Sequence, residues 1–234
     1  MEHPLFPAVL LGLCSLFCIL LALHGLHRVL ERGLWDRQEQ LRIYRAALFV
    51  LAAWVLLLGV LAWRGFFAQW TKVPPRIGMA AMLPLPVVLW ITFSKKGREL
   101  LRSLPPQWPI YLQSFRIVVE IVLWLCVRDG ALPVQMSFEG RNFDILTGLF
   151  ALPVGYYCYV KKSAPSWVAL LYNIGGLLLL VNVVAIAVLS MPTPLRAFHN
   201  EPANTLVAYF PFIYIPGLMV PLAYTLHIFS LRLP

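Results

Sequence analysis

Residues 166–190, SWVALLYNIGGLLLLVNVVAIAVLS, decide the fold class of this chain. The segment contains no Lys, Arg, Asp or Glu. Its length suffices to cross the ~30 Å of membrane hydrocarbon, for which about 20 helical residues are needed. Inside a bilayer the backbone N–H and C=O groups must find partners within the segment, and a helix satisfies them. The stretch therefore predicts a transmembrane helix.

Six further apolar segments of comparable length surround this one. They lie at about 5–26, 46–63, 77–94, 108–127, 143–160 and 205–230. Only short connections remain between them, so a separate soluble module has no room, and we expect a single transmembrane domain over residues 1–234. The sequence thus predicts an all-α fold, a polytopic bundle of seven transmembrane helices.

The composition agrees with a membrane protein. Of the 234 residues, 60% are hydrophobic and 12% are charged, whereas soluble domains carry roughly 25% charged residues. The net charge of +9 does not indicate nucleic-acid binding, because the basic residues flank apolar segments instead of forming a soluble face. Anionic lipid headgroups at the cytoplasmic face are the expected partners. The four cysteines form no C-x-x-C pair, which argues against a zinc knuckle or a disulfide framework.

The basic residues also predict the orientation in the membrane. With seven spans, the loops on one side together carry twelve Lys and Arg, those on the other side carry six, and Arg116 lies within a span. Lys and Arg accumulate in cytoplasmic loops. We therefore expect the N-terminus outside and the C-terminus in the cytoplasm.

Arg116 and Glu120 are the most informative polar residues, since they lie one helical turn apart in the apolar segment 108–127. A charge within the bilayer costs at least ~2.5–3.5 kcal/mol on insertion scales, so both side chains are expected to face the bundle interior and to be paired. One interpretation is a substrate or proton site. The other is a buried ion pair that only fixes helix packing.

A second polar cluster is the run FEGRNFD at 138–144, which enters the fifth apolar segment from the outside. Helix capping accounts for Asn142 as an N-cap and for Asp144 in the first helical turn. It leaves Glu139 and Arg141 without a role. These four residues are therefore candidates for the rim of an outward-facing polar cavity.

Two sets of residues are weaker candidates for metal ligands. His24 and His27 share a face of the first span, and His227 lies at a similar depth in the last. This arrangement is similar to the zinc site of seven-span intramembrane hydrolases related to alkaline ceramidases. Those enzymes also have a His-x-x-x-His pair in the last span, which is missing here. The sequence therefore favours histidines that lie at the membrane interface and bind no metal. His199 and Glu201, in an outer loop, match no established ligand spacing.

Three stretches carry a family resemblance: QSFR at 113–116 with Glu120, the run at 138–144, and SMPTP at 190–194. They resemble a family of uncharacterised bacterial seven-span membrane proteins over about residues 107–234. The likeness is clearest at the Glu-Gly-Arg-Asn-Phe-Asp run. That family has no known activity, so the resemblance implies a multi-pass protein of the bacterial inner membrane and nothing about mechanism.

The sequence favours a non-enzymatic role, a small-solute transporter or ligand-binding membrane protein with an outward-facing polar cavity. Arg116 would hold an anionic group or release Glu120 for protonation. The candidate ligand-contacting residues are Arg116, Glu120, Glu139, Arg141, Asn142, Asp144 and Asn182. No cofactor is expected, and no residue is assigned a catalytic role. The alternatives are an intramembrane metal-dependent hydrolase using the inner histidines, and a non-catalytic assembly or partner protein.

Overall fold

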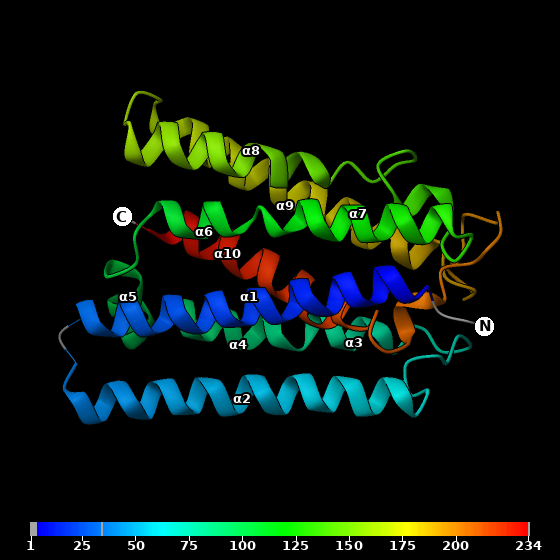
Figure 1. Cartoon of the computed structure of the whole chain (residues 1–234), viewed down its shortest axis with the longest axis horizontal. Helices are drawn as coiled ribbons and strands as arrows, with labels where there is room; N and C mark the ends of the chain where they lie inside the picture. The colour runs from blue at the N-terminus through cyan, green and yellow to red at the C-terminus, as the bar shows by residue number, and fades with distance from the viewer. Residues whose placement is uncertain (1–3, 34, 234) are drawn as a thin grey trace.

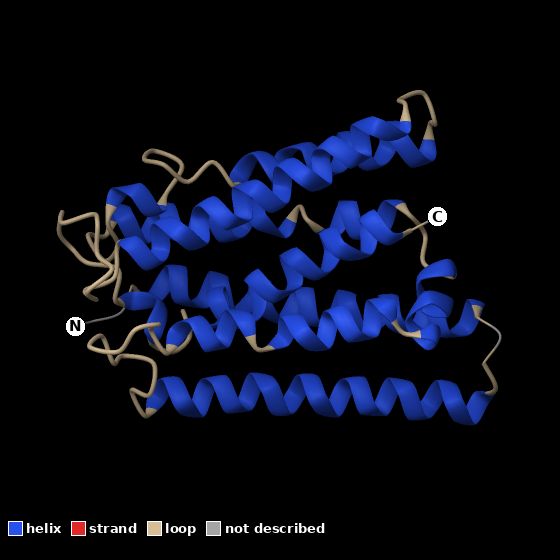
Figure 2. Ribbon diagram, turned by 180° about the vertical axis from the view of Figure 1, so that it is seen from behind, coloured by secondary structure: helices blue, strands red, loops and turns tan. Residues whose placement is uncertain are grey.

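The computed structural model describes residues 4–33 and 35–233, in which the regular structure is helical throughout. The long helices lie roughly along one common axis (Figure 1), and most loops gather at the two ends of the bundle (Figure 2). α1 (Leu5–Arg32) begins at one end and α10 (Val220–Arg232) finishes at the other (Figure 1). The predicted all-α bundle is confirmed.

Four helical stretches are long and apolar enough to cross a membrane. They are α1, α2 (Arg37–Trp63), Gln107–Arg128 and α9 (Ser166–Leu189). A fifth candidate is Ile77–Phe93 together with Lys95–Arg102, which are bent by 77° against each other. Ile145–Val160 is a shorter apolar helix. Apolar helices of this length suggest a membrane protein.

Each of the seven predicted apolar segments contains helical structure, but three boundaries differ clearly from the prediction. α1 and α2 continue into the charged stretch between them, so that only residues 33–36 separate the two helices. Asp36 caps the early start of α2, since its Oδ1 accepts a hydrogen bond from the Glu39 N–H at 2.7 Å. At the C-terminal end, regular helix begins at Ile215 instead of near residue 205, after a 3-10 turn at Leu206–Ala208.

The third apolar segment divides into α3 (Ile77–Met82), α4 (Pro84–Phe93) and α5 (Lys95–Arg102). Pro84 cannot donate a backbone hydrogen bond, which explains the break between α3 and α4. Ser94 starts α5 in a new direction, because its Oγ accepts a hydrogen bond from the Gly97 N–H at 2.9 Å. The charged helix α5 therefore turns away from the apolar α4.

Two other segments contain breaks in regular helix. α6 (Gln107–Leu112) and α7 (Phe115–Arg128) meet at Gln113 and Ser114, where the Arg116 N–H bonds to the Gln113 carbonyl at 3.1 Å in a tightened turn. α8 (Ile145–Gly155) widens into a π-helical turn at Tyr156–Val160, and a second such turn, Ile215–Met219, precedes α10. Pro216 lies inside the second of these wide turns.

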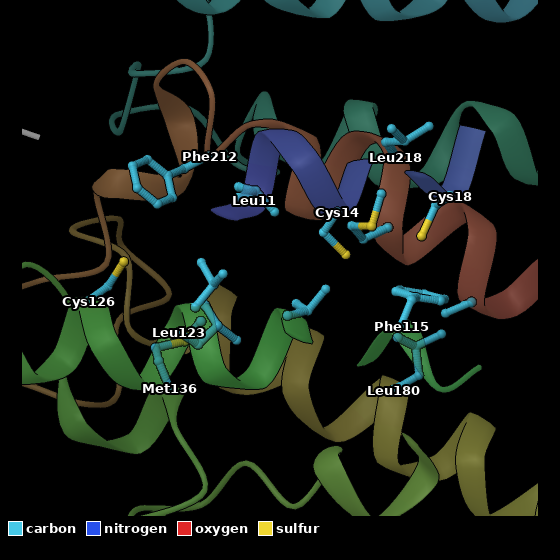
Figure 3. Packing of buried hydrophobic residues seen from close by; sticks show 14 of the residues in the cluster. Leu11, Cys14, Cys18, Phe115, Leu123, Cys126, Met136, Leu180, Phe212 and Leu218 are labelled. Carbon is cyan, nitrogen blue, oxygen red and sulfur yellow. The ribbon is translucent and has the colours of Figure 1, made fainter. Parts of the chain in front are cut away.

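The largest core cluster joins α1, α7, α9 and α10. Figure 3 shows Leu11 and Cys14 of α1 packed with Phe115 and Leu123 of α7 and Leu180 of α9. α2 and the α8–α9 pair form opposite edges of the bundle (Figures 1 and 2). The central helices thus enclose the site described below.

Candidate functional site

Arg116 and Asp144 form a buried ion pair between α7 and α8. Nε of Arg116 donates a hydrogen bond to Oδ2 of Asp144 at 2.7 Å, and Nη2 lies 2.7 Å from Oδ1 in an ion-pair contact. The two residues are 2% and 6% exposed. The expected pairing of Arg116 with Glu120 is wrong, because Arg116 lies in the first turn of α7 and its long side chain reaches across to the neighbouring helix.

Glu120 is hydrogen-bonded to Asn142 instead. The Asn142 amide nitrogen lies 2.8 and 2.9 Å from the two carboxylate oxygens and also donates to the Met136 carbonyl. The Asn142 side-chain oxygen accepts from the Asp144 N–H at 3.1 Å, an Asx turn. This bond satisfies a backbone N–H at the start of α8, which is the capping role predicted for Asn142. Asp144 has helical backbone angles, and its carboxylate contacts Arg116.

A chain of hydrogen bonds continues from Arg116 into α9 and α10. Nη1 of Arg116 lies 3.1 Å from Nε2 of His227, and Nδ1 of His227 lies 2.9 Å from Oδ1 of Asn173. The Asn173 amide donates to Oγ of Ser230 at 2.9 Å. A guanidinium only donates, so Nε2 of His227 accepts and Nδ1 carries the proton. His227 is therefore a neutral link in this chain.

These contacts leave an imbalance of charge in the bundle interior. Arg116 is one cation, and Asp144 and Glu120 are two carboxylates, all three of them buried. Among the residues that the structure describes, no Lys, Arg or His forms an ion pair with Glu120. A buried carboxylate without a cation takes up a proton or recruits a positive group, because charge is costly in a medium of low dielectric constant.

The three charged residues border a cavity of about 90 Å³ between α3, α7, α9 and α10. Most of its wall is apolar, and its lining includes Phe115, Leu123, Met136 and Leu180, side chains that Figure 3 shows in the core cluster. Pro216 and Met219 of the π-helical turn contribute to the wall. The expected polar cavity is instead an apolar one with a single charged patch.

Glu139, Arg141 and Asn182 do not line this cavity. Glu139 and Arg141 are exposed, and the Arg141 guanidinium lies 5.4 Å from the centre of the Phe198 ring. The Asn182 amide donates to the Arg141 carbonyl at 3.0 Å. Arg141 thus contacts α9 and the loop after it, whereas Asn142 and Asp144 of the same run are buried in the bundle.

The candidate metal ligands are not brought together. His24 and His27 are exposed on α1, whereas His227 is buried between Arg116 and Asn173. Within the described ranges no three His, Cys, Asp or Glu side chains are grouped as metal ligands would be. In the loop after α9, Glu201 bonds to Arg196 at 2.9 Å, and this contact lowers the pKa of its carboxyl below the usual range.

Asn173, Gly176 and Gln113 are site residues that the sequence interpretation did not single out. Gly176 lies so close to His227 that a Cβ there would be 2.4 Å from the imidazole Cε1. The Gln113 amide donates to the Ala223 carbonyl at 3.0 Å and ties the break between α6 and α7 to α10. Asn173 and Asn182 are the two amides inside the apolar segment 166–190, and each offers a sequence signal, because polar groups are costly there.

Residues 74–233 match a protein family described as a domain of unknown function (DUF8737). The matched range begins in the loop before α3 and includes every residue of the buried polar chain from Glu120 to Ser230. No curated protein and no solved structure matches the chain. Because the match covers well over half of the sequence, with α1 and α2 preceding it, the chain belongs to the DUF8737 family.

Proposed function

We propose that the protein binds a small monovalent cation with an apolar body at Glu120 in exchange for a proton, and that it carries this cation across the membrane. The observation behind this proposal is the charge balance of the site: Asp144 neutralises Arg116, and Glu120 borders the cavity with no ion-pair partner among the described residues. Neutral Glu120 needs a proton, and a ligand with one positive charge replaces that proton.

The cavity wall supports a ligand with an apolar body. Ligand sites are mostly apolar, and a small number of polar groups orient the bound molecule. Here Glu120 supplies the polar contact, and side chains such as Val119, Val183 and Met219 surround it. An anionic ligand fits the site less well, because the guanidinium of Arg116 is already bound to Asp144.

Two irregular segments beside the cavity support transport over simple binding. Phe115, directly after the break between α6 and α7, and Ile215 of the π-helical turn both contribute to its wall. Transporters commonly place substrate and ion sites at interrupted helices, and π turns recur at functional sites. The proposal includes seven spans in the inner membrane, with the N-terminus outside.

Binding of tetraethylammonium to purified protein tests the exchange, since this ion has a permanent charge and an apolar surface. Calorimetry in buffers of different ionisation enthalpy is expected to count about one proton released per bound cation. Glu120→Gln keeps the side-chain shape but has no acidic proton. It is expected to weaken binding by roughly tenfold or more, because the buried cation is then left without a compensating negative charge.

Glu139→Gln is the matched control, because Glu139 is exposed and lies outside the cavity. It should bind the cation and release protons as the wild type does. In proteoliposomes, a tetraethylammonium gradient should move protons in the wild type and in Glu139→Gln but not in Glu120→Gln. Equal binding by Glu120→Gln and the wild type, or binding without proton release, would show that Glu120 is not the exchange site.

A further inference from the structure

Residues 37–57 of α2 contain no buried side chain; this stretch is charged over 37–45 and apolar from residue 46 onward. The buried residues of α2 are Leu58 and Ala62, both close to its C-terminal end. There Trp54 and Gly217 also link α2 to the bundle, through a hydrogen bond of 2.8 Å from the indole N–H to the backbone carbonyl. Figure 1 shows α2 at the edge of the bundle, beside α1. The half of α2 that follows the α1–α2 turn thus contacts its neighbours through partly exposed side chains, among them Tyr44 beside His27 and Glu39 paired with Lys96.

A cleft of about 340 Å³ separates α1 from α2 beside this turn. Its apolar wall includes Leu20, Leu23 and Leu41, and its polar wall includes His27, Arg37 and Tyr44. Leu20 and Leu41 are exposed, and the apolar surface continues away from the turn along both helices. The cleft therefore combines an apolar channel with a polar end, as an amphiphilic molecule requires.

The polar end of the cleft carries an unbalanced positive charge. Glu31 contacts His27 at 3.2 Å and Arg28 at 3.6 Å, and Glu39 is paired with Lys96 of α5. Over the described part of the chain, no carboxylate forms an ion pair with Arg37, which borders the cleft. An anionic group fits this place.

We infer that this cleft binds one anionic phospholipid, with its phosphate at Arg37 and His27 and an acyl chain between the leucines of α1 and α2. The membrane is the source of the ligand, because the apolar channel opens onto the exposed apolar flank of the two helices. The cleft shares no lining residue with the central cavity. Lipid binding here can therefore be tested separately from the cation exchange proposed at Glu120.

Native mass spectrometry of the full chain, equilibrated with equal amounts of palmitoyl-oleoyl phosphatidylglycerol and phosphatidylcholine, tests this site. Arg37→Gln is expected to lower phosphatidylglycerol occupancy by about fivefold, the effect of one basic residue near an anionic lipid. Arg64→Gln, an exposed arginine at the opposite end of α2, is the control and should leave occupancy unchanged. Both variants alter exposed side chains, so both are expected to fold.

A second pair of variants tests the apolar channel. Leu20→Trp replaces a leucine of the cleft wall with the larger indole and should reduce lipid binding. Leu21 does not line the cleft, so Leu21→Trp should leave lipid binding unchanged. Equal phosphatidylglycerol occupancy in all four variants and the wild type would overturn the inference. Equal retention of phosphatidylcholine and phosphatidylglycerol by the wild type would also overturn it, because the basic end would then contribute no selectivity.

Discussion

Gly176 lies where α9 passes closest to the imidazole of His227. A Cβ at this position would be 2.4 Å from Cε1 and 2.6 Å from Nε2 of the ring, nearer than any side-chain contact allows. His227 cannot move aside freely, since Arg116 and Asn173 hold its two nitrogens. Because Gly176 has no Cβ, α9 can lie close enough to His227 for Asn173 to bond to the imidazole.

We predict that Gly176→Ala destabilises the protein by about 1–3 kcal/mol, the usual effect of overpacking a core. Gly175→Ala is a matched control on the same helix, because a Cβ there meets nothing within 4 Å. That change is expected to be neutral or to stabilise by up to ~1 kcal/mol through helix propensity. Thermal unfolding in detergent measures both. Equal melting temperatures would contradict the close approach of α9 to His227.

At the scale of helices, Arg116 and Asp144 join the start of α7 to the start of α8. Gly148 lets the two helices approach closely, since a Cβ there would be 2.7 Å from Cγ1 of Ile117. The ion pair is nearly inaccessible to water. Breaking such a pair leaves one buried charge uncompensated, whereas replacing both partners with apolar residues removes that penalty.

We predict that Asp144→Leu alone destabilises the protein by about 3–5 kcal/mol, because it leaves Arg116 without its partner. The double variant Arg116→Met, Asp144→Leu is expected to recover most of this loss. Unfolding in a series of detergent mixtures measures the three free energies. Independent, additive effects of the two single changes would contradict the pairing. If the double variant folds and still exchanges protons for tetraethylammonium, the pair serves packing alone.

At the scale of the whole molecule, the helices place their connecting loops alternately at the two ends of the bundle (Figure 1). The end that holds the α1–α2 turn, α5 and the loop before α9 is the richer in Lys and Arg. We expect this end to face the cytoplasm, because Lys and Arg accumulate in cytoplasmic loops.

Single-cysteine labelling in a cysteine-free background tests this orientation. Cysteines at Lys96 and Lys162 should be protected from a membrane-impermeant maleimide added to intact cells, and cysteines at Glu139 and Asn200 should react. All four positions are exposed in the fold, so burial does not account for protection. Permeabilised cells provide the control, in which every position should react. The reverse pattern would overturn the proposed topology.

The sequence by itself determined the helical class and the approximate positions of the apolar segments, because a run such as 166–190 satisfies its backbone only as a helix. It also identified Arg116, Glu120 and Asp144 as residues of interest, since charged side chains in or beside apolar segments need partners. Composition and spacing along one helix carry this information.

Only the tertiary structure decided which of these side chains meet. Arg116 of α7 pairs with Asp144 at the start of α8, and Asn142 donates a hydrogen bond to Glu120. His227 of α10 contacts Arg116. Spacing of four residues brings two side chains onto one helix face, but a long side chain reaches a neighbouring helix as readily. Which partner it finds depends on how closely the helices approach, and glycines such as Gly148 and Gly176 set that distance through packing that local sequence does not encode.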